Sequence, residues 1–104
     1  MPPQSFRDRV AEGKAESWRQ VLLHAADLID RVGWCQHTEC DQSGRVCAAE
    51  ALMSVAAHDV AAYAVAITRL SDSVASPVTV PEWNDAEGRT AAEVTGAMRA
   101  CARQ

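Results

Sequence analysis

Apolar residues recur at steps of three and four over residues 15–32, and this pattern constrains the fold more than any other feature of the sequence. Such spacing places the side chains on one face of an α-helix. Gly33 follows the last of them and can adopt the left-handed conformation that ends a helix. The pattern therefore predicts an amphipathic helix that ends at Gly33. Its apolar stripe consists of Trp18, Val21, Leu22, Ala25, Leu28, Ile29 and Val32.

The other apolar residues predict further helices. Apolar residues make up 48% of the chain, but alanine carries much of that share and aromatic residues contribute only 5%. Alanine faces let helices approach closely, whereas sheets draw on β-branched and aromatic residues. Helices are predicted over residues 46–57 and 60–74, and a last one follows Thr90, which forms a capping-box pattern with Glu93. The expected fold is all-α, a compact bundle of four to five helices. The inward stripe predicted for the third helix is Val60, Tyr63, Ala64, Ile67, Leu70 and Val74.

The segment SPVTVP interrupts the helical pattern. A proline favours extended geometry in the residue before it. Residues 76–83 are therefore predicted to cross the bundle as an extended segment, which lays Val78, Val80 or Trp83 against the helices. Because 104 residues provide one core, residues 14–104 are predicted to form a single helical domain after a flexible N-terminus at residues 1–13.

Charge and hydropathy argue against two classes of partner. The net charge is -4 and the sequence has no basic block, so a nucleic-acid partner is not expected. No apolar run approaches the length of a membrane span, and the first residues lack a secretory signal, so a cytoplasmic protein is expected. In that compartment the four cysteines default to free thiols or metal ligands rather than disulfides.

Short motifs in the middle and at the end of the chain occur in a recognisable order. They are Gly-Trp-Cys-Gln at residues 33–36, Gly-Arg-Val-Cys at 44–47, Ala-Leu at 51–52, Trp-Asn-Asp at 83–85 and Arg-Thr-x-x-Glu-Val at 89–94. In this order they resemble a family of short helical domains of unknown function from actinobacteria and their phages. The resemblance covers about residues 21–101 and implies a fold and a genomic origin, but no activity. Ala49 and Glu50 depart from the family pattern, which has a small residue and a glycine there.

A zinc site is the first alternative for the cysteine-rich loop. Three thiolates and an imidazole suit a tetrahedral structural zinc ion. The spacing C-x-H-x2-C-x6-C nevertheless lacks the paired C-x2-C turns typical of such sites. The main interpretation is that these side chains fill space between helices, and the alternative is a zinc-stabilised domain. The ligands in that alternative are Cys35, His37, Cys40 and Cys47.

A calcium loop is the second alternative. Residues 39–50 follow the EF-hand positions in part, although glutamate stands at the first position and Cys47 at the ninth. The entering helix should also run into the loop, whereas Gly33 ends it early. The matching residues are Glu39, Asp41, Ser43, Gly44, Val46 and Glu50.

Catalysis by cysteine would require a histidine within hydrogen-bond reach and a third group to orient it. His24, His37 and His58 are the available histidines, and each is explained as well by a place on the surface or at a helix end. Cys35 and Cys47 could meet as a redox pair, although neither lies in a C-x-x-C motif. No catalytic residue and no cofactor are therefore predicted.

The tryptophans are the candidates for contact with a protein partner. Trp18 and Trp34 are expected mainly in the core. Trp34 and Trp83 lie at chain corners, where an indole that is left exposed would anchor a partner. The leading hypothesis is a small non-enzymatic protein-interaction module, an accessory protein of a phage or an actinobacterium. Its partner would be a host protein or a second copy, because a homodimer would add burial to a small core.

Overall fold

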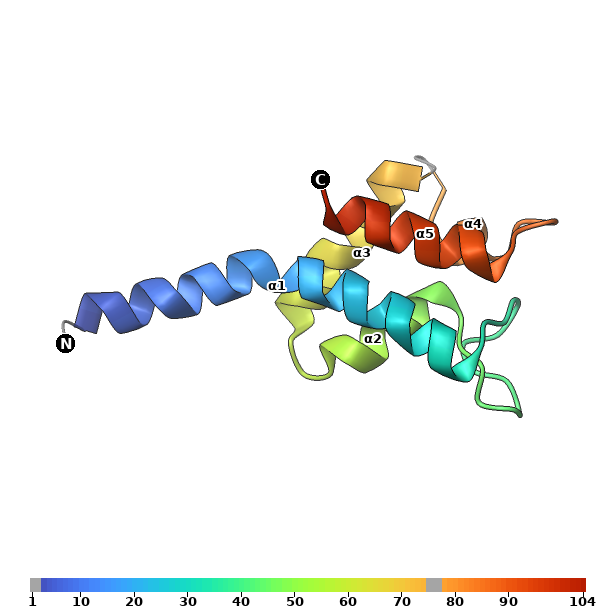
Figure 1. Cartoon of the computed structure of the whole chain (residues 1–104), viewed down its shortest axis with the longest axis horizontal. Coiled ribbons are helices and arrows are strands. Elements are labelled where there is room, and N and C mark those ends of the chain that lie inside the picture. Colours follow the sequence, from blue (N-terminus) through green and yellow to red (C-terminus); the bar gives the residue numbers. More distant parts are fainter. Residues whose placement is uncertain (1–2, 75–77) are drawn as a thin grey trace.

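The described part of the chain forms five α-helices. The computed structural model describes the backbone of residues 3–74 and 78–104, and the side chains of residues 17–74 and 78–104. Within these ranges the backbone pairing outside the helices is limited to isolated bridges, and the predicted all-α fold is confirmed. The helices, shown in Figure 1, are α1 (Pro3–Val32), α2 (Ala48–Ala56), α3 (Val60–Val74), α4 (Val80–Asn84) and α5 (Ala91–Ala102).

The helix α1 is longer than the apolar stripe predicts. It begins at Pro3 and ends at Val32, and its N-terminal half runs beyond the other helices (Figure 1). Gly33 ends it as predicted, with a φ of 97° and a backbone N–H that donates to the carbonyl of Ile29 at 2.8 Å. Residues 3–13 have a helical backbone. That conformation does not measure their flexibility, which stays a prediction.

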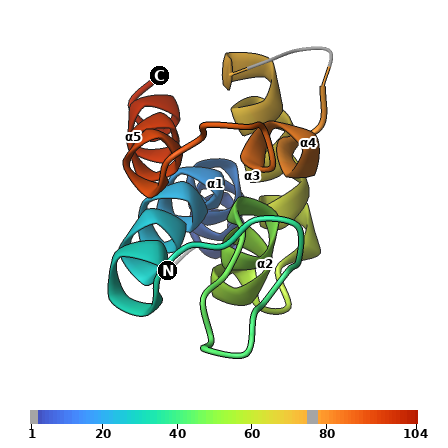
Figure 2. The same cartoon turned by 90° about the vertical axis from the view of Figure 1, so that its right-hand side faces the viewer.

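The C-terminal half of α1 lies at the centre of the bundle. It packs against α2, α3 and α5, and the view along its axis in Figure 2 shows these helices arranged around it. Alanines of α1, α2 and α3 are fully buried in this core, and such small side chains allow helices to approach closely. The largest fully buried apolar side chains are Leu22, Leu52, Leu70, Met98, Val80 and Val94.

The helix α4 corrects the extended crossing predicted for residues 76–83. Residues 76 and 77 lie outside the described residues, but the chain is helical from Val80 to Asn84. Thr79 caps this helix, since its Oγ1 accepts from the backbone N–H of Glu82 at 3.3 Å. A proline in the first helical turn loses no hydrogen bond and already has a helical φ, so Pro81 is accommodated in the first turn of α4. Val80 and Trp83 are buried against the bundle as predicted.

Candidate interaction surface

The loop between α1 and α2 is a small backbone-paired corner. Trp34 pairs with Val46 in a parallel bridge, and Cys40 pairs with Val46 in an antiparallel one. The backbone N–H of Cys35 donates to the carbonyl of Val46 at 3.1 Å, and that of Cys47 donates to Glu39 at 3.0 Å. The loop thus lays three short stretches of chain side by side before α2 begins.

Asn84, at the end of α4, joins this corner to the rest of the molecule. Its side chain is fully buried. The Oδ1 atom accepts from Trp34 Nε1 at 2.6 Å and from the backbone N–H of Ala48 at 2.9 Å. The Nδ2 atom donates to the carbonyl of Cys35 at 3.1 Å and to Asp85 Oδ1 at 3.0 Å. Sequence reasoning named this residue only as part of the Trp-Asn-Asp motif and gave it no role; its one further signal was that it is the only asparagine of the chain.

Gln36 and His37 complete the same contact. Gln36 Nε2 donates to the carbonyls of Asn84 and Ala86 at 3.0 and 2.9 Å. The backbone N–H of His37 donates to Asp85 Oδ1 at 2.9 Å, and this hydrogen bond is the main reason why the pKa of Asp85 lies below its usual value. His37 has a φ of 70°, a conformation that is costly outside glycine and is held here by these bonds.

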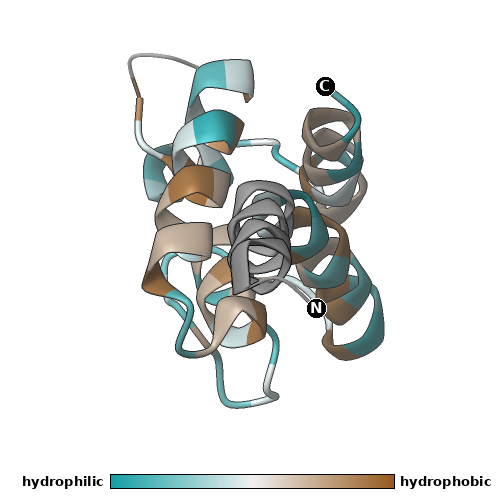
Figure 3. Ribbon diagram, turned by 90° about the vertical axis from the view of Figure 1, so that its left-hand side faces the viewer, coloured by the Kyte–Doolittle hydropathy of each residue, from teal (hydrophilic) through white to brown (hydrophobic). Residues whose placement is uncertain are grey.

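A second region, the outer side of α3, exposes apolar side chains. Val60 is 74% exposed and Val65 is 40% exposed, and from Val60 to Ile67 the helix carries no charged residue. In Figure 3 the N-terminal half of this helix is largely tan to brown, and teal appears toward its C-terminal end. We call this the outer face of α3; it consists of Val60, Ala61, Ala64, Val65 and Thr68, all of them exposed.

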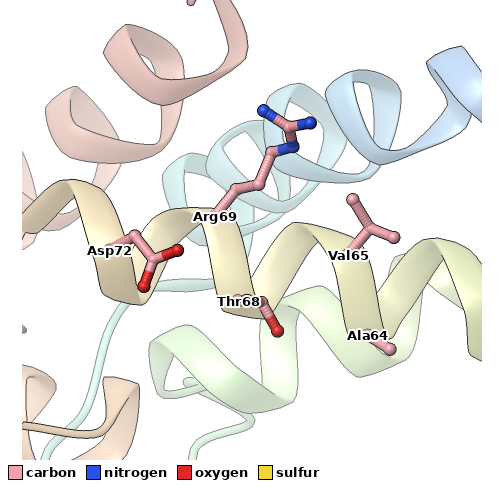
Figure 4. A pocket seen from close by; sticks show the side chains of 5 residues that line it. All are labelled: Ala64, Val65, Thr68, Arg69 and Asp72. Atoms are coloured by element: carbon pink, nitrogen blue, oxygen red, sulfur yellow. The ribbon is translucent and has the colours of Figure 1, made fainter.

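Charged residues border this face at its C-terminal end. An open hollow of about 430 Å³ is lined by the residues that Figure 4 labels, Ala64, Val65, Thr68, Arg69 and Asp72. Arg69 points toward α1 (Figure 4), where its guanidinium lies 4.4 Å from the centre of the Trp18 ring. Sequence reasoning placed Val60 and Ala64 on the inward stripe. Both are exposed, and the structure buries Ala62 and Ala66 in their place, because a helix that is apolar nearly all round gives no unique inward face. The rest of the stripe is confirmed, since Leu70 is buried and the other large side chains pack against the core.

A family model described as a family of unknown function, DUF6197, matches residues 14–104. The chain belongs to the DUF6197 family. The match covers the corner, the outer face of α3 and all of α2 to α5, and it begins at the residue where the helical domain was predicted to begin. Neither a curated protein nor a solved structure gives a significant match.

The DUF6197 domain does not bring together the four ligands of the alternative zinc site. The Cys35 thiol donates to the carbonyls of Arg45 and Thr38 at 3.3 and 3.4 Å. Cys47 Sγ accepts from the backbone N–H of Glu50 at 3.4 Å and so caps α2, while Cys40 and His37 are exposed. Among the described residues, no three histidine, cysteine, aspartate or glutamate side chains are placed to hold a metal ion.

The loop that matches an EF-hand in part uses its central carboxylate internally. Asp41 Oδ1 accepts from the backbone N–H groups of Ser43 and Arg45 at 3.0 and 2.9 Å, and Oδ2 accepts from Arg45 Nε. Burial raises the pKa of Asp41, but the bonds from Arg45 outweigh that effect and lower the pKa below its usual value. Glu50 lies within α2 and accepts from Ser54. These oxygens stabilise a turn and the first part of a helix.

Cys35 and Cys47 are two buried thiols of the corner. They follow the two residues of the Trp34–Val46 bridge, but each sulfur is hydrogen-bonded to the backbone of its own loop or helix rather than to the other sulfur. Burial is the largest influence on both thiols and raises the pKa of each. Cys47 also borders an open cavity of about 210 Å³ together with His37 and Asp85. A raised pKa leaves little thiolate, the reactive form, at neutral pH.

The tryptophans of the domain differ in what they offer a partner. Trp18 is 4% exposed, between the guanidinium groups of Arg19 and Arg69, and Trp83 is 6% exposed with Arg89 over its ring. The ring of Trp83 thus fills the core, and the exposed indole that would anchor a partner is not found at this residue. Trp34 is half-buried and its indole N–H donates to Asn84. It therefore offers a partner only a small part of its ring.

Transmembrane insertion has no candidate helix in the described part of the chain. Within residues 3–74 and 78–104, no helix combines the length and the apolar character that spanning a bilayer requires.

Proposed function

We propose that this DUF6197 chain is a small non-enzymatic protein-interaction module that binds its partner through the outer face of α3. The carrying observation is the exposure of Val60 and Val65 on a helix that has no charged side chain from Val60 to Ile67. A surface helix normally turns a polar face to water, and a helix that is apolar on both sides is usually covered on both. A protein partner would supply that cover.

The biological setting is part of the same proposal. The chain would act in the cytoplasm as an accessory protein of an actinobacterium or one of its phages, and the partner would be a host protein or a second copy of the chain. The order of motifs that resembles such a family supports the genomic setting, and the reduced state of all four cysteines is compatible with the compartment.

Affinity capture with matched variants tests the proposal. Tagged wild-type chain and the double variant Val60→Arg/Val65→Arg are incubated with lysate of the source cells that also contains untagged chain, and retained proteins are identified by mass spectrometry. Val32→Arg is the control, because Val32 is 38% exposed and lies at the end of α1, away from this face. We expect a protein, either a host protein or the untagged chain, that wild type and control retain and the double variant loses. Identical retention by all three chains would contradict the proposal.

A further inference from the structure

We propose that the corner between α1 and α2 is a redox-sensitive latch, in which Cys35 and Cys47 form a reversible intramolecular disulfide. This goes beyond the proposed function, because it assigns a regulated state to a part of the domain other than the outer face of α3. Both thiols are free in this structure, which therefore shows the reduced state. Disulfides of cytoplasmic proteins are mostly transient and redox-sensing.

Backbone pairing brings the two cysteines to a spacing that suits a disulfide. Trp34 and Val46 form a parallel bridge, and the backbone N–H of Cys35 donates to the carbonyl of Val46 at 3.1 Å. Cys35 and Cys47 are the next residues in the same register, and the backbone of Cys47 is extended. Paired parallel strands lie about 4.8 Å apart, and their in-register side chains point to the same face. A disulfide joins Cα atoms that are about 4.4 to 6.8 Å apart.

Asn84 holds the two thiol-bearing stretches next to each other. Its Nδ2 atom donates to the carbonyl of Cys35 at 3.1 Å. Its Oδ1 atom accepts from the backbone N–H of Ala48, which follows Cys47, at 2.9 Å. One fully buried side chain thus fixes both ends of the disulfide that we propose. Burial is the main cause of the raised pKa of Cys35, and the charges of Asp41 and Cys47 raise it further, an effect that requires the two sulfurs to be close.

The oxidant is a low-molecular-weight disulfide, and two exchange steps complete the reaction. The Cys47 thiolate attacks one sulfur of the oxidant, which breaks the S–S bond of the oxidant and releases one small thiolate. The Cys35 thiolate then attacks Cys47 Sγ and displaces the second small thiolate, and the two leaving groups take up the protons that the cysteines lose. Cys47 reacts first because it borders the open cavity of about 210 Å³. Both thiols are buried in the closed corner, so the exchange takes place when the corner opens briefly, and it is slow.

Oxidation changes what the two sulfurs do in the fold. In the reduced state Cys47 Sγ accepts from the backbone N–H of Glu50 at 3.4 Å and caps α2. The Cys35 thiol donates to the carbonyls of Arg45 and Thr38 at 3.3 and 3.4 Å. The disulfide replaces these hydrogen bonds, which are weak because sulfur is a weak donor and acceptor, by a covalent link between the loop and the start of α2. The oxidised corner should therefore open less often than the reduced corner.

Mapping of linked peptides is the main test. A Cys40→Ser chain, which lacks the exposed thiol, is equilibrated with mixtures of reduced and oxidised glutathione, alkylated and digested with trypsin. Cleavage after Arg45 separates the two cysteines into peptides 32–45 and 46–69. We expect mass spectrometry to find these peptides linked in the native chain, and the link should be lost as the share of reduced glutathione rises. A chain that carries no such link at any ratio, or only mixed disulfides with glutathione, would overturn the proposal.

The same titration in concentrated urea is the control for geometry. In the unfolded chain the two cysteines meet only by chance, so we expect the native chain to form the disulfide at a ratio of oxidised to reduced glutathione that is about tenfold lower or less. Equal ratios would show that the fold does not favour the pair and would contradict the latch. Cys101, a buried thiol on α5, should form links only in urea. A link to Cys101 that is as frequent in the native chain as the link between Cys35 and Cys47 would also refute the proposal. Far-UV circular dichroism confirms that the Cys40→Ser chain is folded.

Discussion

At the scale of single residues, Asn84 has the largest consequence for stability. It satisfies Trp34 Nε1, the backbone N–H of Ala48 and the carbonyl of Cys35 with one fully buried amide. Asn84→Ala leaves these groups without a partner, so we expect the free energy of unfolding to fall by about 3 kcal/mol. Urea denaturation measures it. Gln20→Ala, at an exposed position, is the control and should change little. A variant as stable as wild type would show that water replaces the amide.

The cysteines give a second prediction at the same scale. Only Cys40 is exposed, and burial raises the pKa of Cys35, Cys47 and Cys101. We expect iodoacetamide at neutral pH to modify one thiol per native chain and four in denaturant, as counted by mass spectrometry, because both access and thiolate are missing at the buried sites. Cys40→Ser should leave the native chain nearly unreactive. Fast alkylation of Cys47 in that variant would revive the hypothesis of a catalytic cysteine.

At the scale of elements, the N-terminal caps fix where the short helices begin. Thr90 Oγ1 accepts from the backbone N–H of Glu93 at 3.2 Å while Glu93 accepts from the N–H of Thr90 at 3.1 Å. Thr90→Ala should lower the free energy of unfolding by about 1 kcal/mol, because it leaves amides of the first turn unpaired. Thr68→Ala in the middle of α3 should not destabilise, since alanine is the better helix former there. Thermal denaturation of both variants at low concentration measures these changes. Equal midpoints for Thr90→Ala and Thr68→Ala would mean that α5 is held by packing alone.

The same caps explain which elements could be predicted from the sequence. The pattern at Thr90 and Glu93 was identified as a cap, and α5 was predicted correctly. Thr79 and Glu82 show the same spacing, yet two neighbouring prolines favoured an extended interpretation. Pro81 lies in the first turn of α4, where its effect on the preceding residue is outweighed by its helical φ and by an N–H that is not needed. The short length of α4 also leaves no periodic stripe to detect.

At the scale of the whole molecule, the folded unit should coincide with residues 14–104, which the family model also covers. Removal of residues 1–13 should leave the urea midpoint unchanged, because the described core draws its buried residues from Trp18 onward. Denaturation of the full and shortened chains, with amide spectra of both, measures this. A lower midpoint for the shortened chain would show that the first turns of α1 contribute to the core and would contradict the predicted flexible terminus.

The candidate surface was harder to predict than the fold, for a physical reason. Large side chains such as Leu22 and Leu28 mark the inward face of α1, so its stripe could be assigned from spacing. In α3 the alanines and valines occur on every side, and spacing alone assigned Val60 to the core although it is 74% exposed. The positions of the other four helices, all of which contact α3, decide which side of it is covered.

The corner around Asn84 also bears on how the chain matures during synthesis. The loop after α1 leaves the ribosome long before α4 does, yet its indole and its carbonyl at Cys35 are satisfied by a residue of α4. Until that residue emerges, the nascent loop lacks its closing partner, and its Cys35 and Cys47 thiols are open to oxidants that the finished domain excludes. Slow elongation over the last third of the message would lengthen this vulnerable interval.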